Sequence, residues 1–216
     1  MNPVEHVIYK LRNAKILLYP YPHFYVEDVF PAGFYAQLLD ALPPDEGYAP
    51  LAGGYANRQA AKGEIELVQE FNGAYFGQNV LKVFMKQFFD RFPNADRANF
   101  KQDLRFIRDQ EGYKIGPHTD APQKVVSLLF YLPRTDADAD CGTGIYVPSD
   151  HLKTCAGGPH HLFDGFEEVW RAPFLPNSCF GFWKTPNSWH AVSKICRKIE
   201  RNVLLFNIYE DSSPGA

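Results

Sequence analysis

The spacing of apolar residues divides the chain into a first part with helices and a second part built of strands. Within 31–42, Phe34, Leu38 and Leu42 recur at every fourth position, which predicts an amphipathic helix ended by the two prolines that follow. A second apolar stripe predicts a helix facing the core at Asn79–Phe92. The other elements expected in this part are a short helix at Pro3–Leu17 and a strand at His23–Val29.

From about residue 99 onward, apolar or alternating runs of strand length follow one another, and turn-rich segments separate them. Many short strands after two helices predict a mainly β fold, a double-stranded β-helix or jelly roll buttressed by N-terminal helices. No internal repeat or linker divides the sequence, so we expect a single domain over 1–216, with its support at about 1–98 and its jelly-roll core at about 99–210. The expected strands are Asp103–Arg108, Lys124–Leu132, Thr143–Val147, Glu167–Pro173, Ser178–Trp183, His190–Ile195 and Val203–Tyr209.

Two segments without a period are expected to shape a pocket beside this core. They are Asp45–Gly63, which is rich in Gly, Ala and Tyr and is predicted to be a loop, and Ser149–Gly165. Gly112–Pro117 and Ser149–Gly158 are among the turn-rich segments that separate the predicted strands. Nothing in Asp45–Gly63 or Ser149–Gly165 indicates the chemical class of a ligand.

Composition excludes several classes of protein. The 216 residues are 45% hydrophobic and 22% charged, which is ordinary for a globular protein and unlike a disordered one. The 22 basic residues are outnumbered by 25 acidic ones, so general nucleic-acid binding is not expected. No run approaches the ~18 apolar residues of a membrane span. The N-terminus lacks the features of a signal peptide and the four cysteines lack zinc or redox spacing, so we expect reduced thiols and a cytoplasmic location.

Three residues have the right chemistry to hold a metal ion. His118 and Asp120 are two positions apart, so on an extended chain their side chains project from the same face. Chance matches to so short a pattern are common, and a surface histidine is the plain alternative. His190 opens another predicted strand after a turn. Two histidines and one carboxylate leave three coordination positions open, which suits non-haem Fe(II) with oxygen and a chelating cosubstrate, whereas a closed zinc site favours four ligands with several thiolates.

Basic side chains in the second part are candidates for binding an anion. Arg201 lies eleven residues after His190, and its guanidinium is suited to bind a carboxylate through two hydrogen bonds. The alternative is that Arg201 belongs to a solvated run of charge. Strand alternation predicts that one of Arg105 and Arg108 points into the barrel toward substrate or cosubstrate. The further histidines, whose roles as substrate contacts or surface residues stay open, are His151, His160 and His161.

In order and spacing, His118, Asp120, His190 and Arg201 resemble the signature of the Fe(II)- and 2-oxoglutarate-dependent oxygenases, especially the prolyl-hydroxylase-like branch with its bacterial members. The resemblance extends over roughly 19–209. Its supporting segments are Tyr21-Pro22-His23-Phe24, Glu111-Gly112-Tyr113, Val126–Leu132, Gly142-Thr143-Gly144-Ile145-Tyr146 and Phe180-Gly181-Phe182-Trp183.

The resemblance implies a jelly-roll fold that binds Fe(II) at its mouth through His118, Asp120 and His190. It also implies 2-oxoglutarate as cosubstrate, with its far carboxylate on Arg201 and on Tyr131. The intact Asp120 argues against the halogenase variant of the family, in which a small residue stands at that position.

One position departs from the family pattern. Family members often carry a serine two residues after the arginine, whereas Arg201 is followed by Asn202 and Val203. The resemblance therefore implies that the carboxylate lacks this hydroxyl partner, and it leaves open whether Asn202 replaces it.

The implied function is that of a dioxygenase that uses O2 and couples the oxidative decarboxylation of 2-oxoglutarate to succinate and CO2 with hydroxylation, or a related C–H oxidation. Two alternatives stay open: a non-catalytic jelly-roll module that binds metal, and a cupin-type metalloenzyme that does not use 2-oxoglutarate. A small molecule, a saccharide-linked intermediate and a peptidyl side chain are all compatible substrates, and the sequence does not indicate the oligomeric state.

Overall fold

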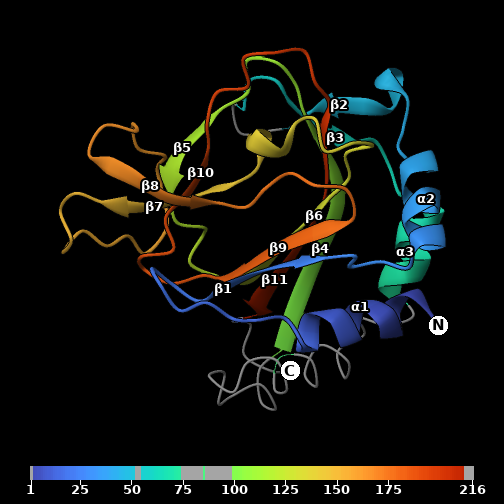
Figure 1. Ribbon diagram of the computed structural model, residues 1–216, viewed down its shortest axis with the longest axis horizontal. Coiled ribbons are helices and arrows are strands. Elements are labelled where there is room, and N and C mark those ends of the chain that lie inside the picture. The colour runs from blue at the N-terminus through green and yellow to red at the C-terminus, as the bar shows by residue number, and fades with distance from the viewer. Residues whose placement is uncertain (1, 52–54, 74–84, 86–98, 212–216) are drawn as a thin grey trace.

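Two antiparallel sheets face each other in the computed structural model, which describes residues 2–51, 55–73, 85 and 99–211 (Figure 1). The larger sheet has the strand order β1 (His23–Glu27), β9 (Ser178–Trp183), β6 (Lys124–Tyr131), β11 (Arg201–Asp211), β4 (Asn99–Asp109), β3 (Arg58–Ala61) and β2 (Tyr48–Pro50). The smaller sheet has the order β5 (Ile115–His118), β10 (His190–Val192), β7 (Gly144–Pro148) and β8 (Phe166–Arg171).

The α-helices that the structure describes lie on the outer side of the larger sheet, away from the smaller one (Figure 1). They are α1 (Pro3–Arg12), α2 (Ala32–Asp40) and α3 (Glu66–Gly73). α1 begins where the side chain of Asn2 accepts a hydrogen bond of 3.0 Å from the backbone N–H of Val4. The apolar stripes of the helices pack in one buried cluster with strand side chains. Among its members are Val7, Leu11, Leu38, Phe71, Phe106, Phe130 and Phe206.

β6 shows why the central strands are apolar on both faces. Phe130 belongs to the cluster beneath the helices, whereas the next residue, Tyr131, belongs to a second cluster with Phe180 and Val203 between the two sheets. A strand covered on both sides needs no polar face, so its sequence is a continuous apolar run rather than an alternating one.

The β-rich architecture predicted from the sequence is confirmed, and the predicted strand at Ser178–Trp183 has the observed bounds of β9. The helix predicted over 31–42 is present as α2, and the N-terminal helix ends earlier than predicted, at Arg12. The helix expected at Asn79–Phe92 lies outside the described residues, apart from the buried Met85.

Two predictions of local structure were wrong, and one helix was missed. Asp45–Gly63 is not a loop throughout, because it contains β2 and β3, which pair with each other, and β3 pairs with β4. The predicted turn at Gly112–Pro117 contains most of β5, and α3 was not predicted. These strands are only three or four residues long, too short for a period of two to stand out in the sequence.

Within the part of the chain that the structure describes, no helix has both the length and the apolar character of a membrane span.

Candidate metal centre

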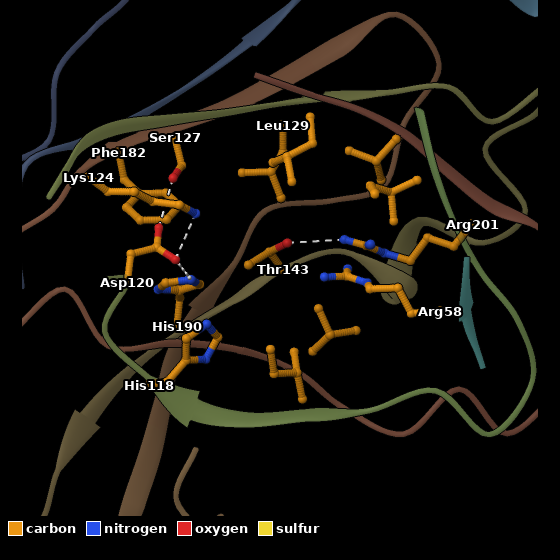
Figure 2. Close-up of a pocket in the computed structure, with 15 residues that line it drawn as sticks. Arg58, His118, Asp120, Lys124, Ser127, Leu129, Thr143, Phe182, His190 and Arg201 are labelled. Carbon is orange, nitrogen blue, oxygen red and sulfur yellow. Dashed lines mark hydrogen bonds and ion pairs between the residues drawn. The ribbon is translucent and has the colours of Figure 1, made fainter. Parts of the chain in front are cut away.

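Three side chains that could hold a metal ion meet at one end of the smaller sheet. His118 is the last residue of β5 and His190 the first of β10, and the two residues lie opposite each other in the antiparallel pair. Asp120 follows two residues after His118. One ligand atom from each of the three side chains lies within 4.8 Å of the others, and the three point toward one another (Figure 2). The predicted convergence of distant parts of the chain is therefore present.

Hydrogen bonds to the backbone set the tautomer of both histidines. Nδ1 of His118 lies 2.9 Å from the carbonyl oxygen of Gly116, and Nδ1 of His190 lies 2.9 Å from that of Ser188. A carbonyl oxygen accepts only, so each Nδ1 carries the proton and donates it. Each Nε2 then keeps a free lone pair, which is the form in which imidazole binds a metal.

The carboxylate of Asp120 is oriented by two partners. Ser127 donates a hydrogen bond of 2.8 Å to Oδ2, and Nζ of Lys124 lies 3.0 Å from Oδ1. Burial alone would raise the pKa of Asp120, but Lys124 and the two histidines lower it by more than burial raises it. The pKa of Asp120 therefore lies below its ordinary value.

The pKa values of both histidines are lowered, chiefly by burial; His190 lowers that of His118 further, and Asp120 opposes the shift at both rings. At neutral pH the three side chains are thus two neutral imidazoles and one carboxylate. This donor set fits a divalent transition metal such as Fe(II).

The three side chains line one end of a cavity whose opposite end is formed by Arg58, Thr143 and Arg201 (Figure 2). Between the two ends the walls are mainly apolar. They include Ile107, Ile115, Leu129, Phe182, Val192, Val203 and Leu205. A cavity with a metal-binding group at one end and guanidinium groups at the other suits an elongated molecule with an anionic tail.

Arg201 is fully buried and held by three groups of the protein. Its Nε donates to the carbonyl oxygen of Cys141 at 2.7 Å, Nη1 to Oδ2 of Asp109 at 2.7 Å, and Nη2 to Oγ1 of Thr143 at 3.1 Å. The alternative of a solvated surface arginine is therefore wrong.

Asp109 also binds a second arginine. Nε of Arg58 lies 2.6 Å from Oδ1 of Asp109, and Nη2 of Arg58 lies 2.9 Å from Oδ2. Arg58 is opposite Asp109 in the β3–β4 pair, and Asp109 is opposite Arg201 in the β4–β11 pair. The three residues therefore form a row across three neighbouring strands.

Tyr131 lies behind this end of the cavity rather than among the residues that line it. Its hydroxyl oxygen accepts a hydrogen bond of 3.1 Å from the backbone N–H of Thr143, and its ring centre lies 5.5 Å from the guanidinium carbon of Arg201. Asn202 is not part of this end, since its Oδ1 accepts from Nε of Arg108 at 3.0 Å and it lines a different cavity.

One of Arg105 and Arg108 was expected to point into the barrel toward a ligand, but neither of them lines the cavity. Arg108 points to the opposite side of the sheet, where it also donates to Asp45 at 2.8 Å, and Arg105 pairs with Asp103. From that end of β4, Ile107 lines the cavity and Asp109 binds Arg201. By strand alternation Arg105 shares a face with these two residues, but its side chain pairs with Asp103 instead of reaching the cavity.

The histidines of the loop between β7 and β8 occupy different environments. The ring of His160 lies 4.6 Å from that of His118 and 5.5 Å from that of Tyr55, measured between ring centres. The ring of His161 packs 5.3 Å from that of Trp189 instead, and His151 is exposed. His160 is thus the loop histidine beside the metal-binding residues.

Sequence reasoning missed several residues of this site. Arg58 stands in a segment without a period, and Asp109 lies one residue beyond the strand predicted at Asp103–Arg108. Ser127 and Lys124 gave a weak signal, since they are the polar residues of an otherwise apolar strand. Only the pairing of β3, β4 and β11 shows that Arg58 and Asp109 belong with Arg201.

No family model matches this sequence, and no curated protein matches it either. Solved structures do match its fold. A prolyl-4-hydroxylase from Pseudomonas putida is 16% identical, with a TM-score of 0.56 over 97% of this chain and 100% of that one. A prolyl hydroxylase from Trichoplax adhaerens, in complex with a peptide fragment of the hypoxia inducible factor oxygen degradation domain, is 10% identical, with a TM-score of 0.56 over 96% and 89%.

The epimerase SnoN, in complex with Fe3+, alpha ketoglutarate and nogalamycin RO, is 13% identical, with a TM-score of 0.54 over 97% of this chain and 84% of that one. Likeness at these identities establishes architecture, whereas activity depends on the site. The protein has the double-stranded β-helix fold of the 2-oxoglutarate- and iron-dependent oxygenases.

Proposed function

We propose that the protein is an Fe(II)- and 2-oxoglutarate-dependent oxygenase that hydroxylates a C–H bond of an organic substrate. The observation that carries this proposal is one cavity with His118, Asp120 and His190 at one end and the buried Arg201 at the other. A site that only bound metal would have no use for a buried guanidinium facing the metal ligands across apolar walls.

His118, Asp120 and His190 would hold the iron, because their three ligand atoms converge and both histidines present an unprotonated Nε2. When bound, iron and 2-oxoglutarate supply the oxidising power of the reaction, since 2-oxoglutarate is converted with O2 to succinate and CO2 and a C–H bond is oxidised. The chain contributes orientation and water exclusion. Ser127 holds Asp120 in place, and apolar walls such as Leu129 and Val192 keep water from the space between the ends of the cavity.

Arg201 would bind the far carboxylate of 2-oxoglutarate, with the hydroxyl of Thr143 beside it. Because this hydroxyl lies 3.1 Å from Nη2 of Arg201, it would supply the hydroxyl partner that the missing family serine would otherwise provide. Tyr131 was predicted to bind the same carboxylate directly. Its contacts with Thr143 and Arg201 support a role in fixing the position of both groups.

The comparisons support both the cosubstrate and the reaction. The SnoN structure holds Fe3+ and alpha ketoglutarate, and two of the structures with the same fold are prolyl hydroxylases. A small molecule, a saccharide-linked intermediate or a peptidyl side chain would enter past His160, whose ring lies beside that of His118. A cytoplasmic location, where 2-oxoglutarate is available, is part of the same proposal.

The test is an anaerobic titration of the purified protein with Fe(II) and then with 2-oxoglutarate, followed by visible spectroscopy. We expect a charge-transfer band only when both are present, and succinate to form when O2 is admitted. His118→Ala should abolish the band with no loss of folded structure, whereas His151→Ala, a change at an exposed histidine, should leave it intact. Incorporation of one atom of 18O2 into a substrate would distinguish hydroxylation from epimerisation.

The alternatives give different results in the same titration. Iron binding without a band would favour a metal-binding module or a cupin-type enzyme that does not use 2-oxoglutarate. O2 uptake that is independent of 2-oxoglutarate would identify the cupin-type enzyme. Failure to bind iron at all would overturn the proposed function.

A further inference from the structure

The carboxylate-binding end of the cavity has a charge balance that Arg201 alone does not explain. Asp109 is fully buried and forms a hydrogen-bonded ion pair of 2.7 Å with Arg201. Opposite charges in direct contact cancel, so the pair of Arg201 and Asp109 offers no net positive charge to an incoming carboxylate. Burying a further carboxylate beside a neutral pair is costly unless another cation compensates it.

Arg58 supplies that cation. It binds Asp109 through both carboxylate oxygens, so the row of two guanidinium groups and one carboxylate has a net charge of +1. Lys124, the other cationic residue of the cavity lining, sits at the metal end against Asp120. Arg58 is therefore the source of the excess positive charge at the end where Arg201 lies.

Arg58 also has the more available hydrogen-bond donors. A guanidinium carries five N–H groups, and Arg201 directs all three of its nitrogens at Cys141, Asp109 and Thr143. Arg58 uses only Nε and Nη2, and its Nη1 makes no hydrogen bond to any residue within the described ranges 2–51, 55–73, 85 and 99–211. Figure 2 shows its guanidinium pointing into the cavity toward Thr143.

The position of Arg58 is well defined even though it lies near the edge of the sheet. Its guanidinium carbon lies 4.4 Å from the ring centre of Tyr113, and only 16% of its side chain is exposed. Stacking on an aromatic ring and a two-point contact with Asp109 hold the planar group in one orientation. A donor held in advance loses little entropy when it binds an anion.

We propose that Arg58, from outside the jelly-roll core, is a second cosubstrate-binding residue that binds the far carboxylate of 2-oxoglutarate together with Arg201. Asp109 is the positioning residue, because it binds both guanidinium groups and holds them at this end of the cavity. This inference rests on the proposed function, because it takes 2-oxoglutarate to be the ligand. It predicts that the cosubstrate is recognised by strands of the N-terminal part and of the core together.

The test measures binding rather than turnover. Iron-loaded protein is titrated anaerobically with 2-oxoglutarate and, separately, with 2-oxobutanoate, which has the same keto acid but no far carboxylate. Arg58→Met should weaken 2-oxoglutarate binding by roughly 10–100-fold, the range expected for loss of charge-assisted hydrogen bonds. Its affinity for 2-oxobutanoate and for Fe(II) should be unchanged, because neither contacts Arg58.

Charge restoration provides the second arm. Arg58→Met combined with Asp109→Asn leaves Arg201 as an uncompensated cation, so the net charge returns to +1 and part of the lost affinity for 2-oxoglutarate should return. Arg58→Lys keeps the charge without the planar fork and should bind 2-oxoglutarate more tightly than Arg58→Met. The matched control is Arg105→Met, since Arg105 is partly exposed and pairs with Asp103 outside the cavity.

Two results would overturn the inference, and they differ in what else they affect. If wild-type protein binds 2-oxoglutarate and Arg58→Met binds it equally well, Arg58 has no part in recognition and the proposed function stands. An equal loss of affinity for 2-oxoglutarate and 2-oxobutanoate in Arg58→Met would likewise mean that the residue only maintains the fold. If iron-loaded wild-type protein does not bind 2-oxoglutarate, the proposed function fails together with the inference.

Discussion

The hydroxyl of Ser127 donates a hydrogen bond of 2.8 Å to Oδ2 of Asp120, seven residues earlier in the chain. The other carboxylate oxygen, Oδ1, lies 3.9 Å from Nε2 of His190. Ser127 thus holds one oxygen so that the second faces the neighbouring metal ligand. Both partners are buried, so the orientation does not depend on solvent. A partner of this kind increases metal affinity by reducing the number of orientations the ligand must lose on binding.

Ser127→Ala should therefore weaken binding of Fe(II), or of Mn(II) as a redox-stable substitute, by roughly 10–100-fold. The measurement is isothermal calorimetry under anaerobic conditions. Ser149→Ala, at an exposed serine, is the control and should bind metal like wild type. Unchanged metal affinity in Ser127→Ala would mean that Lys124 alone suffices to orient Asp120.

Thr143 offers a prediction about the hydroxyl at the other end of the cavity. Thr143→Val removes the acceptor of Arg201 Nη2 and keeps the shape of the side chain, while the backbone N–H that binds Tyr131 remains. We expect 2-oxoglutarate affinity to fall about 5–20-fold, in line with the loss of one hydrogen bond to a charged group. Metal affinity should not change. Wild-type affinity for 2-oxoglutarate in this variant would show that the hydroxyl serves Arg201 alone.

The convergence of His118, Asp120 and His190 in one cavity with Arg201 could be predicted from the sequence, because the types, order and spacing of these residues form a pattern. The strands β6, β9 and β11 were also predictable, since each is six or more residues long and mostly apolar. Arg58 was not, because it belongs to a strand of four residues near an edge of the sheet, and a segment this short has no readable period.

Asp109 shows a different reason why a site residue could not be predicted from the sequence. A local pattern does not specify which of two faces of a strand is turned inward, and Asp109 lies one residue beyond the strand predicted at Asp103–Arg108. The partners of Asp109 are 51 and 92 residues away in sequence, on strands whose neighbourhood is decided by the pairing of the whole sheet. No local property of the sequence contains that information.

Asn177 gives a prediction about stability. Its side-chain carbonyl accepts from the backbone N–H of Phe30 at 2.9 Å, and its amide donates to the backbone oxygen of Phe30 at 2.9 Å. Its φ of 55° lies in the left-handed region, which asparagine tolerates better than alanine. Asn177→Ala should lower the free energy of unfolding by about 2–4 kcal/mol, through two lost hydrogen bonds and backbone strain.

Asn177→Gly separates the two contributions. Glycine adopts a positive φ without strain, so this variant loses the hydrogen bonds but should be about 1 kcal/mol more stable than the alanine variant. Urea unfolding of the three proteins followed by circular dichroism measures both differences. Equal stability of the glycine and alanine variants would mean that the turn relaxes out of the left-handed conformation.

Two half-buried tyrosines predict how stability depends on pH. Tyr25 donates to the carbonyl oxygen of Pro173 at 2.9 Å and Tyr35 to that of Pro133 at 2.6 Å, and burial raises the pKa of each to about 12. In the unfolded chain both hydroxyls have a pKa near ~10, so from about pH 10 the unfolded state releases protons that the folded state retains. Their contribution to stability is therefore complete below pH ~10 and is lost as the pH rises toward 12.

Urea unfolding at pH 8.5 and pH 11 measures this loss of stability. The double variant Tyr25→Phe/Tyr35→Phe should lose less stability between the two pH values than wild type does. The control Tyr9→Phe, at a hydroxyl on an exposed ring, should lose as much stability as wild type. If the double variant loses as much stability as wild type, the alkaline decline arises at other groups, because phenylalanine has no proton to release.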